Sequence, residues 1–256
     1  MIEYLAFLAV GFLIAILFYR QSKDHFEILQ IDGERLSELP TLYQEKSPIV
    51  VRQMTLPLLG TESELRKRPH LLKLAVSPTF TLGHLLQSPD SLAAFTFTKE
   101  SAEFLAKESG VSVWFQHMLF PKLLPSPYTA PFYTSNVSLW PHHRGLFKTT
   151  AFQTVVYPTQ GTIHVSLLLS SMIPFLPSPW KERQFSKLTP QDTPLLSQIK
   201  FFEIIVRKGT LLLLPPHILV DIRSSSASAS ASAEKEKEHA WTSIAEIHHP
   251  ISRIAT

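Results

Sequence analysis

Hydrophobic and polar residues follow different patterns in the two halves of the chain. The second half is dominated by short apolar or alternating runs bounded by turn residues, a pattern typical of β-strands. We predict strands within residues 136–140, 150–158, 162–171, 201–208, 210–216, 218–222 and 239–252, and two earlier ones within 26–32 and 47–54. Many short strands separated by turns predict a β-sandwich or a β-barrel.

The predicted helices lie in the first half. Residues 97–110 favour a helix, because Thr98 can cap its start and Gly110 can end it. Residues 36–46 also have a helical composition, although a proline interrupts them. Residues 111–120 are largely apolar and fit either a strand or a buried helix. The expected fold is therefore mainly β with a few helices.

An uncharged stretch at the N-terminus predicts a transmembrane helix. Residues 4–19 carry no charge, and Arg20 and Lys23 follow directly. With the Arg20 side chain reaching toward the surface, residues 1–20 suit a hydrocarbon layer about 30 Å thick. We expect residues 2–19 to contact the lipid bilayer as an uncleaved anchor.

Two alternatives to an anchor remain for this stretch. A cleaved signal peptide favours a basic start and small residues at its cleavage site, whereas this segment begins with Glu3 and ends in bulky and charged residues. A buried helix of a soluble protein usually keeps some polar residues. For a single-pass anchor, the positive charges that follow the span predict that residues 21–256 lie in the cytosol.

Residues 224–239 interrupt the β-rich half with a low-complexity sequence of serine, alanine, glutamate and lysine. Small side chains cannot offset the entropy lost on ordering, so we interpret this stretch as a mobile loop inserted between two strands. Its removal should leave the fold intact.

Composition excludes several classes of function. The 256 residues contain no cysteine, which excludes disulfides, thiolate catalysis and cysteine-ligated zinc. The net charge is only +3 and the basic residues are scattered, so no nucleic-acid partner is expected. The glycine-containing motifs of serine hydrolases, phosphate-binding loops and dinucleotide-binding folds do not occur.

The order of three segments resembles the cupin-like JmjC-type family. Residues 29–54 are similar to that family's opening strand, helix and strand, residues 138–168 to its central hairpin, and residues 201–222 to its closing strand pair. The resemblance implies a double-stranded β-helix (a cupin or jelly-roll fold), in which two sheets face each other around a site. Members are often Fe(II)- and 2-oxoglutarate-dependent oxygenases. The fused apolar helix and reduced motifs are also similar to divergent domains of this type in large DNA viruses and their hosts.

The residues at the family's metal-ligand positions are unsuited to iron. The resemblance places Lys148 and Thr150 at its H-x-D/E pair and Val220 at its last histidine. Ile163 stands where many relatives have the lysine that holds the oxoacid. A facial triad needs two histidines and a carboxylate, so we expect a domain that has lost its metal site.

Histidine offers a second, weaker route to a metal site. The best cluster that can be assembled from the eleven histidines is His142, His164 and His217. Adjacent strand residues point to opposite faces, so only one histidine of each pair at 142–143 and 248–249 could face a shared metal. Glu203 and Asp221 are isolated in the sequence.

Two classes of function follow from these patterns. The first is a membrane-anchored, non-catalytic cupin/JmjC-like domain that binds an unknown protein partner or has a structural role, with no cofactor and no catalytic residue. The second is an Fe(II)/2-oxoglutarate-dependent oxygenase, of the hydroxylase or demethylase type, with a rearranged metal site.

Overall fold

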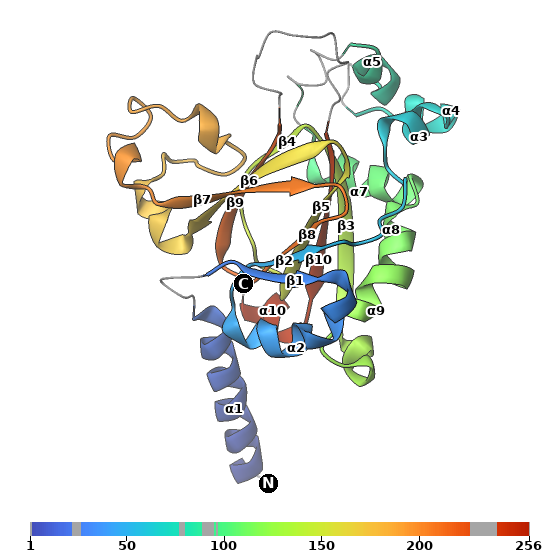
Figure 1. The fold of residues 1–256 in the computed structure, drawn as a ribbon. Coiled ribbons are helices and arrows are strands. Elements are labelled where there is room, and N and C mark those ends of the chain that lie inside the picture. The colour runs from blue at the N-terminus through green and yellow to red at the C-terminus, as the bar shows by residue number, and fades with distance from the viewer. Residues whose placement is uncertain are drawn as a thin grey trace.

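Two β-sheets and a set of short helices make up the protein, which we describe from a computed structural model (Figure 1). The structure describes residues 2–21, 27–76, 80–88, 95, 97–225 and 240–255. The low-complexity stretch therefore lies outside the described residues, except for Ser224 and Ser225.

Apart from one strand, the strands overlap the regions that the sequence predicts, although the last predicted strand ends at His248 and residues 250–252 belong to a helix. The strands are β1 (Leu29–Asp32), β2 (Ile49–Arg52), β3 (Thr134–Pro141), β4 (His143–Lys148), β5 (Gln153–Gln160), β6 (Thr162–Leu169), β7 (Phe201–Arg207), β8 (Leu211–Leu214), β9 (Ile218–Ser224) and β10 (Trp241–His248). The expectation of a mainly β chain is confirmed. Only β4 was not predicted from the pattern of alternation.

Short helices precede and surround the strands. They are α1 (Ile2–Arg20), α2 (Leu39–Leu42), α3 (Glu62–Arg66), α4 (Pro69–Leu72), α5 (Leu82–Gln87), α7 (Lys99–Glu108), α8 (Val111–Trp114), α9 (Phe120–Leu123) and α10 (Pro250–Ala255). The predicted helix at 97–110 is confirmed, because the Thr98 hydroxyl accepts a hydrogen bond from the Ser101 N–H at the start of α7. Residues 111–120, which also fitted a strand, are helical.

The strands form a six-stranded sheet in the order β1-β2-β8-β5-β10-β3 and a four-stranded sheet in the order β4-β9-β6-β7. All neighbouring strands are antiparallel except β1 and β2. Val156 and Leu212 of the larger sheet share one buried hydrophobic cluster with Val165 and Val220 of the smaller sheet. The two sheets therefore enclose a common core.

Different segments cover the outer faces of the two sheets. Helices α7 and α8 pack on β3, and the Trp114 ring contacts the Tyr157 ring of β5 (Figure 1). Residues 170–200, which we call the side lobe, cover the smaller sheet through a second apolar cluster. That cluster consists of Leu146, Leu168, Leu176, Ile199 and Leu219.

The side lobe is joined to the edge of the smaller sheet at a glycine. The Leu146 N–H donates to the Arg183 carbonyl at 2.7 Å, and the Glu182 N–H donates to the Leu146 carbonyl at 2.8 Å. A Cβ on Gly145 would lie 2.0 Å from the Glu182 carbonyl oxygen. Only glycine permits this close approach of two backbones.

Helix α1 projects from the end of the molecule at which α2 and α10 lie (Figure 1). Residues Glu3–Arg20 have a mean hydropathy of 1.7 and are long and apolar enough to cross a membrane, a description that a signal sequence also fits. The last turn of α1 contacts the β domain: the Tyr19 hydroxyl donates to the Thr150 carbonyl at 3.0 Å, and the Lys46 ammonium donates to the Phe18 carbonyl at 2.6 Å.

A candidate ligand-binding cavity

A cavity of about 680 Å³ opens along β4. This volume is typical of sites that bind small molecules. Its lining comes from the end of α1, the start of α7, strands β3 and β4, the side lobe and the turn before β9. The lining residues are Arg20, Phe97, Lys99, Trp140, His143, Arg144, Gly145, Leu146, Phe147, Lys148, Thr150, Ser170, Trp180, Lys181, Glu182 and His217.

The lining is strongly cationic. It contains five Lys and Arg side chains, two His side chains and one carboxylate, that of Glu182. Four aromatic rings, from Phe97, Trp140, Phe147 and Trp180, complete it. A concave site that combines aromatic surface with several cations is suited to a ligand that is partly apolar and negatively charged.

Arg144 is the cation that β4 places deepest between aromatic rings. Its guanidinium carbon lies 3.7 Å from the centre of the Phe147 ring and 4.8 Å from that of the Trp140 ring. Burial lowers the pKa of Arg144, and the negative charge of Glu246 is the largest influence that opposes this shift. An arginine remains charged under these conditions, so the cavity keeps a half-buried positive charge at Arg144.

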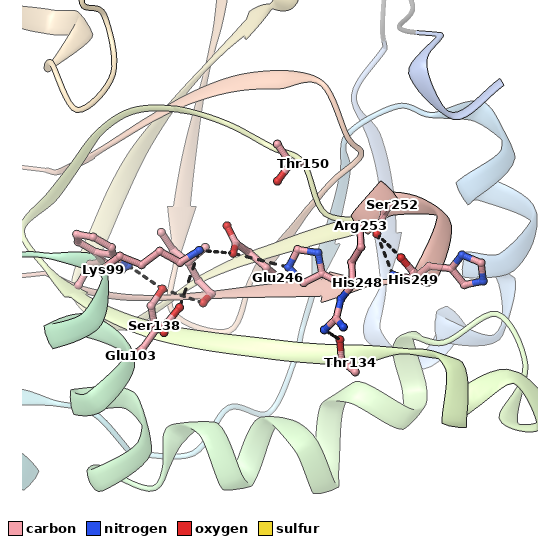
Figure 2. A network of polar contacts seen from close by, with 12 residues as sticks. Lys99, Glu103, Thr134, Ser138, Thr150, Glu246, His248, His249, Ser252 and Arg253 are labelled. Carbon is pink, nitrogen blue, oxygen red and sulfur yellow. Dashed lines mark hydrogen bonds and ion pairs between the residues drawn. The ribbon is translucent and has the colours of Figure 1, made fainter. Parts of the chain in front are cut away.

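Glu246 of β10 organises the polar network behind the cavity (Figure 2). Its carboxylate lies 3.0 Å from the Lys99 ammonium and 3.9 Å from His248 Nε2. Burial alone would raise the pKa of Glu246, but the hydrogen bond from His248 and the charges of Lys99 and Arg144 outweigh it and hold the pKa at about 2. Glu246 is therefore ionised, and it takes up part of the positive charge of Lys99 and Arg144.

The end of α1 forms the other end of the cavity. The Tyr19 ring packs edge-on against the His217 ring, with the ring centres 5.6 Å apart. Burial and the nearby charge of Lys148 lower the pKa of His217, so the imidazole is neutral at pH 7. Arg20, the last residue of α1, lines the cavity beside these groups.

The structure brings together two of the three predicted metal-ligand positions. Lys148 ends β4 and Thr150 follows it, and both line the cavity. Val220 is fully buried opposite Phe147 and is not among the lining residues. An ammonium group, a hydroxyl and an alkyl side chain do not fit Fe(II), so the family's iron cannot be held by these three positions.

The three histidines of the alternative cluster are not brought together. His164 of β6 lies opposite Arg223 near the end of β9, and the His142 carbonyl accepts from the Ser224 N–H. His217 precedes β9, six residues before Arg223, which corresponds to roughly 20 Å along a strand. Among the residues that the structure describes, no group of three or more His, Cys, Asp or Glu side chains could hold a metal ion.

His164 instead belongs to a small polar cluster across three strands. Its Nδ1 lies 2.7 Å from a carboxylate oxygen of Glu203, and Arg223 donates to the same oxygen at 2.5 Å. Glu203, isolated in the sequence, thus has two partners from neighbouring strands. Sequence spacing could not show these two partners, because strand pairing joins residues that lie far apart in the sequence.

Sequence reasoning missed Arg144 and Glu246, which determine the charge of the cavity. The alternation along β10 could have indicated that Glu246 is important. Glu246 lies on the same face of the strand as Thr242 and Ile244, which are both buried. A carboxylate in such a position needs a cationic partner. The sequence could not show that this partner lies on β4 and α7.

No protein-family model matches the chain, and no curated protein matches it. Among solved structures it is similar to hydroquinone 1,2-dioxygenase from Sphingomonas sp. TTNP3, crystallised with 4-hydroxybenzoate bound. The two share 17% identity with a TM-score of 0.28, over 46% of this chain and 61% of the dioxygenase chain.

Proposed function

We propose that this protein is a membrane-anchored, non-catalytic cupin/JmjC-like domain and that the cationic cavity is its binding site for a small anionic ligand. The domain would be a double-stranded β-helix, in which eight strands form two facing four-stranded sheets. The strand orders β8-β5-β10-β3 and β4-β9-β6-β7 support this assignment, as does the core that the two sheets share.

The observation that carries the proposal is the charge of the cavity. Five Lys and Arg side chains against a single carboxylate favour an anion, and the half-buried guanidinium of Arg144 offers a forked donor that suits a carboxylate or a phosphate. The positions where the resembled family has its metal ligands hold Lys148, Thr150 and Val220, which supports binding rather than oxidation.

Membrane anchoring is supported by the length and composition of α1. The positive charge of Arg20 at its end favours a single-pass arrangement with the β domain in the cytosol. Alkaline carbonate extraction of the expressed full chain should leave it in the membrane pellet with residues 2–19 retained. Release into the supernatant, or a mature start beyond Tyr19, would contradict the anchor.

Anion binding is tested on the full chain in a neutral detergent. Calorimetric titration with inorganic phosphate and with succinate should show saturable binding of at least one of them, weakened about tenfold or more by Arg144→Gln. Arg207→Gln on β7 is the matched control, because Arg207 does not line the cavity. Absence of binding, or equal loss in both variants, would reject the proposal.

The same preparation distinguishes the oxygenase alternative. Metal analysis should find no stoichiometric iron, zinc or manganese. Adding Fe(II) with 2-oxoglutarate should raise the melting temperature no more than the same concentration of succinate, which carries the same charge. Stoichiometric metal that disappears in His217→Ala would overturn the non-catalytic assignment.

A further inference from the structure

We infer that the ligand of the cavity is the phosphorylated head group of a membrane lipid, presented from the bilayer in which α1 is anchored. The inference rests on the proposed function and specifies the chemical class and source of the anion. It is carried by the position of the cavity relative to α1.

The cationic lining begins where the apolar helix ends. The membrane-spanning window closes at Arg20, and the Arg20 side chain lines the cavity. In a bilayer, lipid phosphates lie in the polar layer that covers the hydrocarbon on each side, about 5–8 Å thick. One wall of the cavity would therefore stand at the depth of the phosphates.

The β domain is held at this depth by direct contacts with the last turn of α1. Tyr19 donates to the Thr150 carbonyl at 3.0 Å, and its own carbonyl lies 3.2 Å from His217 Nε2. Lys46 donates to the carbonyls of Phe18 and Gln21. These bonds join the helix to two sides of the domain, so the opening of the cavity keeps a fixed position relative to the end of the anchor.

Several phosphate donors line the cavity. Arg20 ends α1, the neighbouring Tyr19 donates to the Thr150 carbonyl, and Lys148 and Arg144 lie four residues apart on β4. A phosphate monoester carries a charge of about −1.5 to −2 at pH 7, which two or more of these cations would neutralise. The aromatic rings provide surface for the apolar part next to the phosphate.

Exposed apolar side chains lie on segments near α10, the helix that packs against α1. Ile254 of α10, which packs on α1, is 59% exposed. Tyr128 and Phe132 of the 3-10 helix Pro127–Phe132 are 90% and 62% exposed, and the Tyr133 ring that follows contacts His249 next to α10 at 5.0 Å. Aromatic side chains are enriched at the interface between membrane and water. Their location fits a domain that faces the bilayer with the end at which α10 lies.

The experiment titrates the full chain in neutral detergent with three probes: dihexanoyl phosphatidic acid, dihexanoyl phosphatidylcholine and inorganic phosphate. Fluorescence of Trp140 and Trp180 in the cavity, checked by calorimetry, reports binding. We expect phosphatidic acid to bind at least tenfold more tightly than either other probe. Lys148→Gln and Arg144→Gln should each reduce that affinity about tenfold, whereas Lys200→Gln outside the cavity should not.

The outcomes separate this inference from the proposed function. Equal affinity for inorganic phosphate and phosphatidic acid, still dependent on Arg144, would keep the anion site and overturn the lipid source. Lipid binding that neither Lys148→Gln nor Arg144→Gln weakens would also overturn the inference. If no anion binds at all, the proposed function fails with it. Lys148 and Arg144 are both half-buried and lie at opposite ends of β4, so the test does not depend on Arg144 alone.

Discussion

Individual charges in this fold are determined by partners that the sequence does not place next to them. Arg144 and Glu246 are about a hundred residues apart, yet each shifts the pKa of the other. Alternation along β10 puts Glu246 on a mostly buried face, which sequence reasoning can detect. The identity of the partners follows only from the pairing of strands and the position of α7, so the charge of the cavity could not be predicted.

Glu246 should stabilise the fold in a pH-dependent way. Its folded pKa of about 2 lies below the ordinary 4.5, so its stabilisation is present above pH 4.5 and is lost as the pH falls toward 2. Glu246→Gln should lower the free energy of unfolding at pH 7 by roughly 3 kcal/mol. Denaturant unfolding at several pH values measures this, with the exposed Glu34→Gln as control. A difference from wild type that stays constant between pH 6 and pH 3 would contradict the assignment.

Asp221 should have the opposite effect. It is buried on β9, burial raises its pKa to about 6, and neither carboxylate oxygen makes a well-oriented hydrogen bond within the described chain. A raised carboxyl pKa means that stability is highest when the group is protonated and falls as the pH rises from about 4 through 6. Asp221→Asn should therefore raise the melting temperature at pH 7.5 and lose this advantage at pH 4.

The exposed Glu45→Gln is the control for Asp221→Asn. A variant that is less stable than wild type at pH 7.5 would show that the ionised Asp221 has a favourable partner. At the scale of single residues, the two carboxylates therefore predict opposite pH dependences. Burial raises the pKa of both groups, but only at Glu246 do neighbouring cations outweigh it.

Most elements follow from local pattern, and the exceptions have physical reasons. The helix at α7 is specified by its caps. Residues 111–120 were ambiguous because they are largely apolar, although Val111, Phe115 and Leu119 are buried at the four-residue spacing of a helix. Strand β4 was missed because Arg144, Gly145 and Lys148 break its alternation, and these residues serve the cavity and the side lobe.

The attachment of the side lobe should depend on Gly145. Any side chain there meets the Glu182 backbone, and overpacking of this kind costs about 1–3 kcal/mol or displaces a neighbour. Gly145→Val should detach the lobe from β4, lower the melting temperature and weaken anion binding, because Trp180 and Lys181 line the cavity. Limited proteolysis should show faster cleavage within residues 170–200. Gly11→Val in α1, where a Cβ meets no neighbour, is the control.

The low-complexity insertion should be dispensable. Ser224 and Ala240, at the two ends of the insertion, are both bonded to His142. The Ser224 N–H donates to the His142 carbonyl at 2.6 Å, and the His142 N–H donates to the Ala240 carbonyl at 2.9 Å. A short connection can span this gap, and loop length changes stability only by about 0.6 kcal/mol per doubling. Replacing residues 226–238 with Gly-Ser-Gly should leave the melting temperature within a few degrees. A larger fall would mean that the segment packs on the domain.

For the whole molecule, composition and strand count predicted a mainly β chain behind an apolar helix, and the structure has both. The cavity was not predictable in the same way. It is formed by segments from Arg20 to His217 that lie far apart in the sequence and are brought together by the two sheets and the side lobe. The resemblance to a metalloenzyme family places Lys148 and Thr150 at metal-ligand positions. Both residues line the cavity, but neither side chain is suited to bind Fe(II).

The contact between α1 and the cavity bears on how strongly the site needs to bind. With α1 anchored as proposed, a lipid in the same leaflet would meet the site as a ligand confined to the same surface, at an effective concentration of the order of millimolar. An intrinsic dissociation constant of about 1 mM, equivalent to roughly −4 kcal/mol, would then already give half-occupancy. The exposed Arg20 and the half-buried guanidinium of Arg144 would be sufficient for such a site, and its occupancy would respond to the abundance of the lipid in the leaflet.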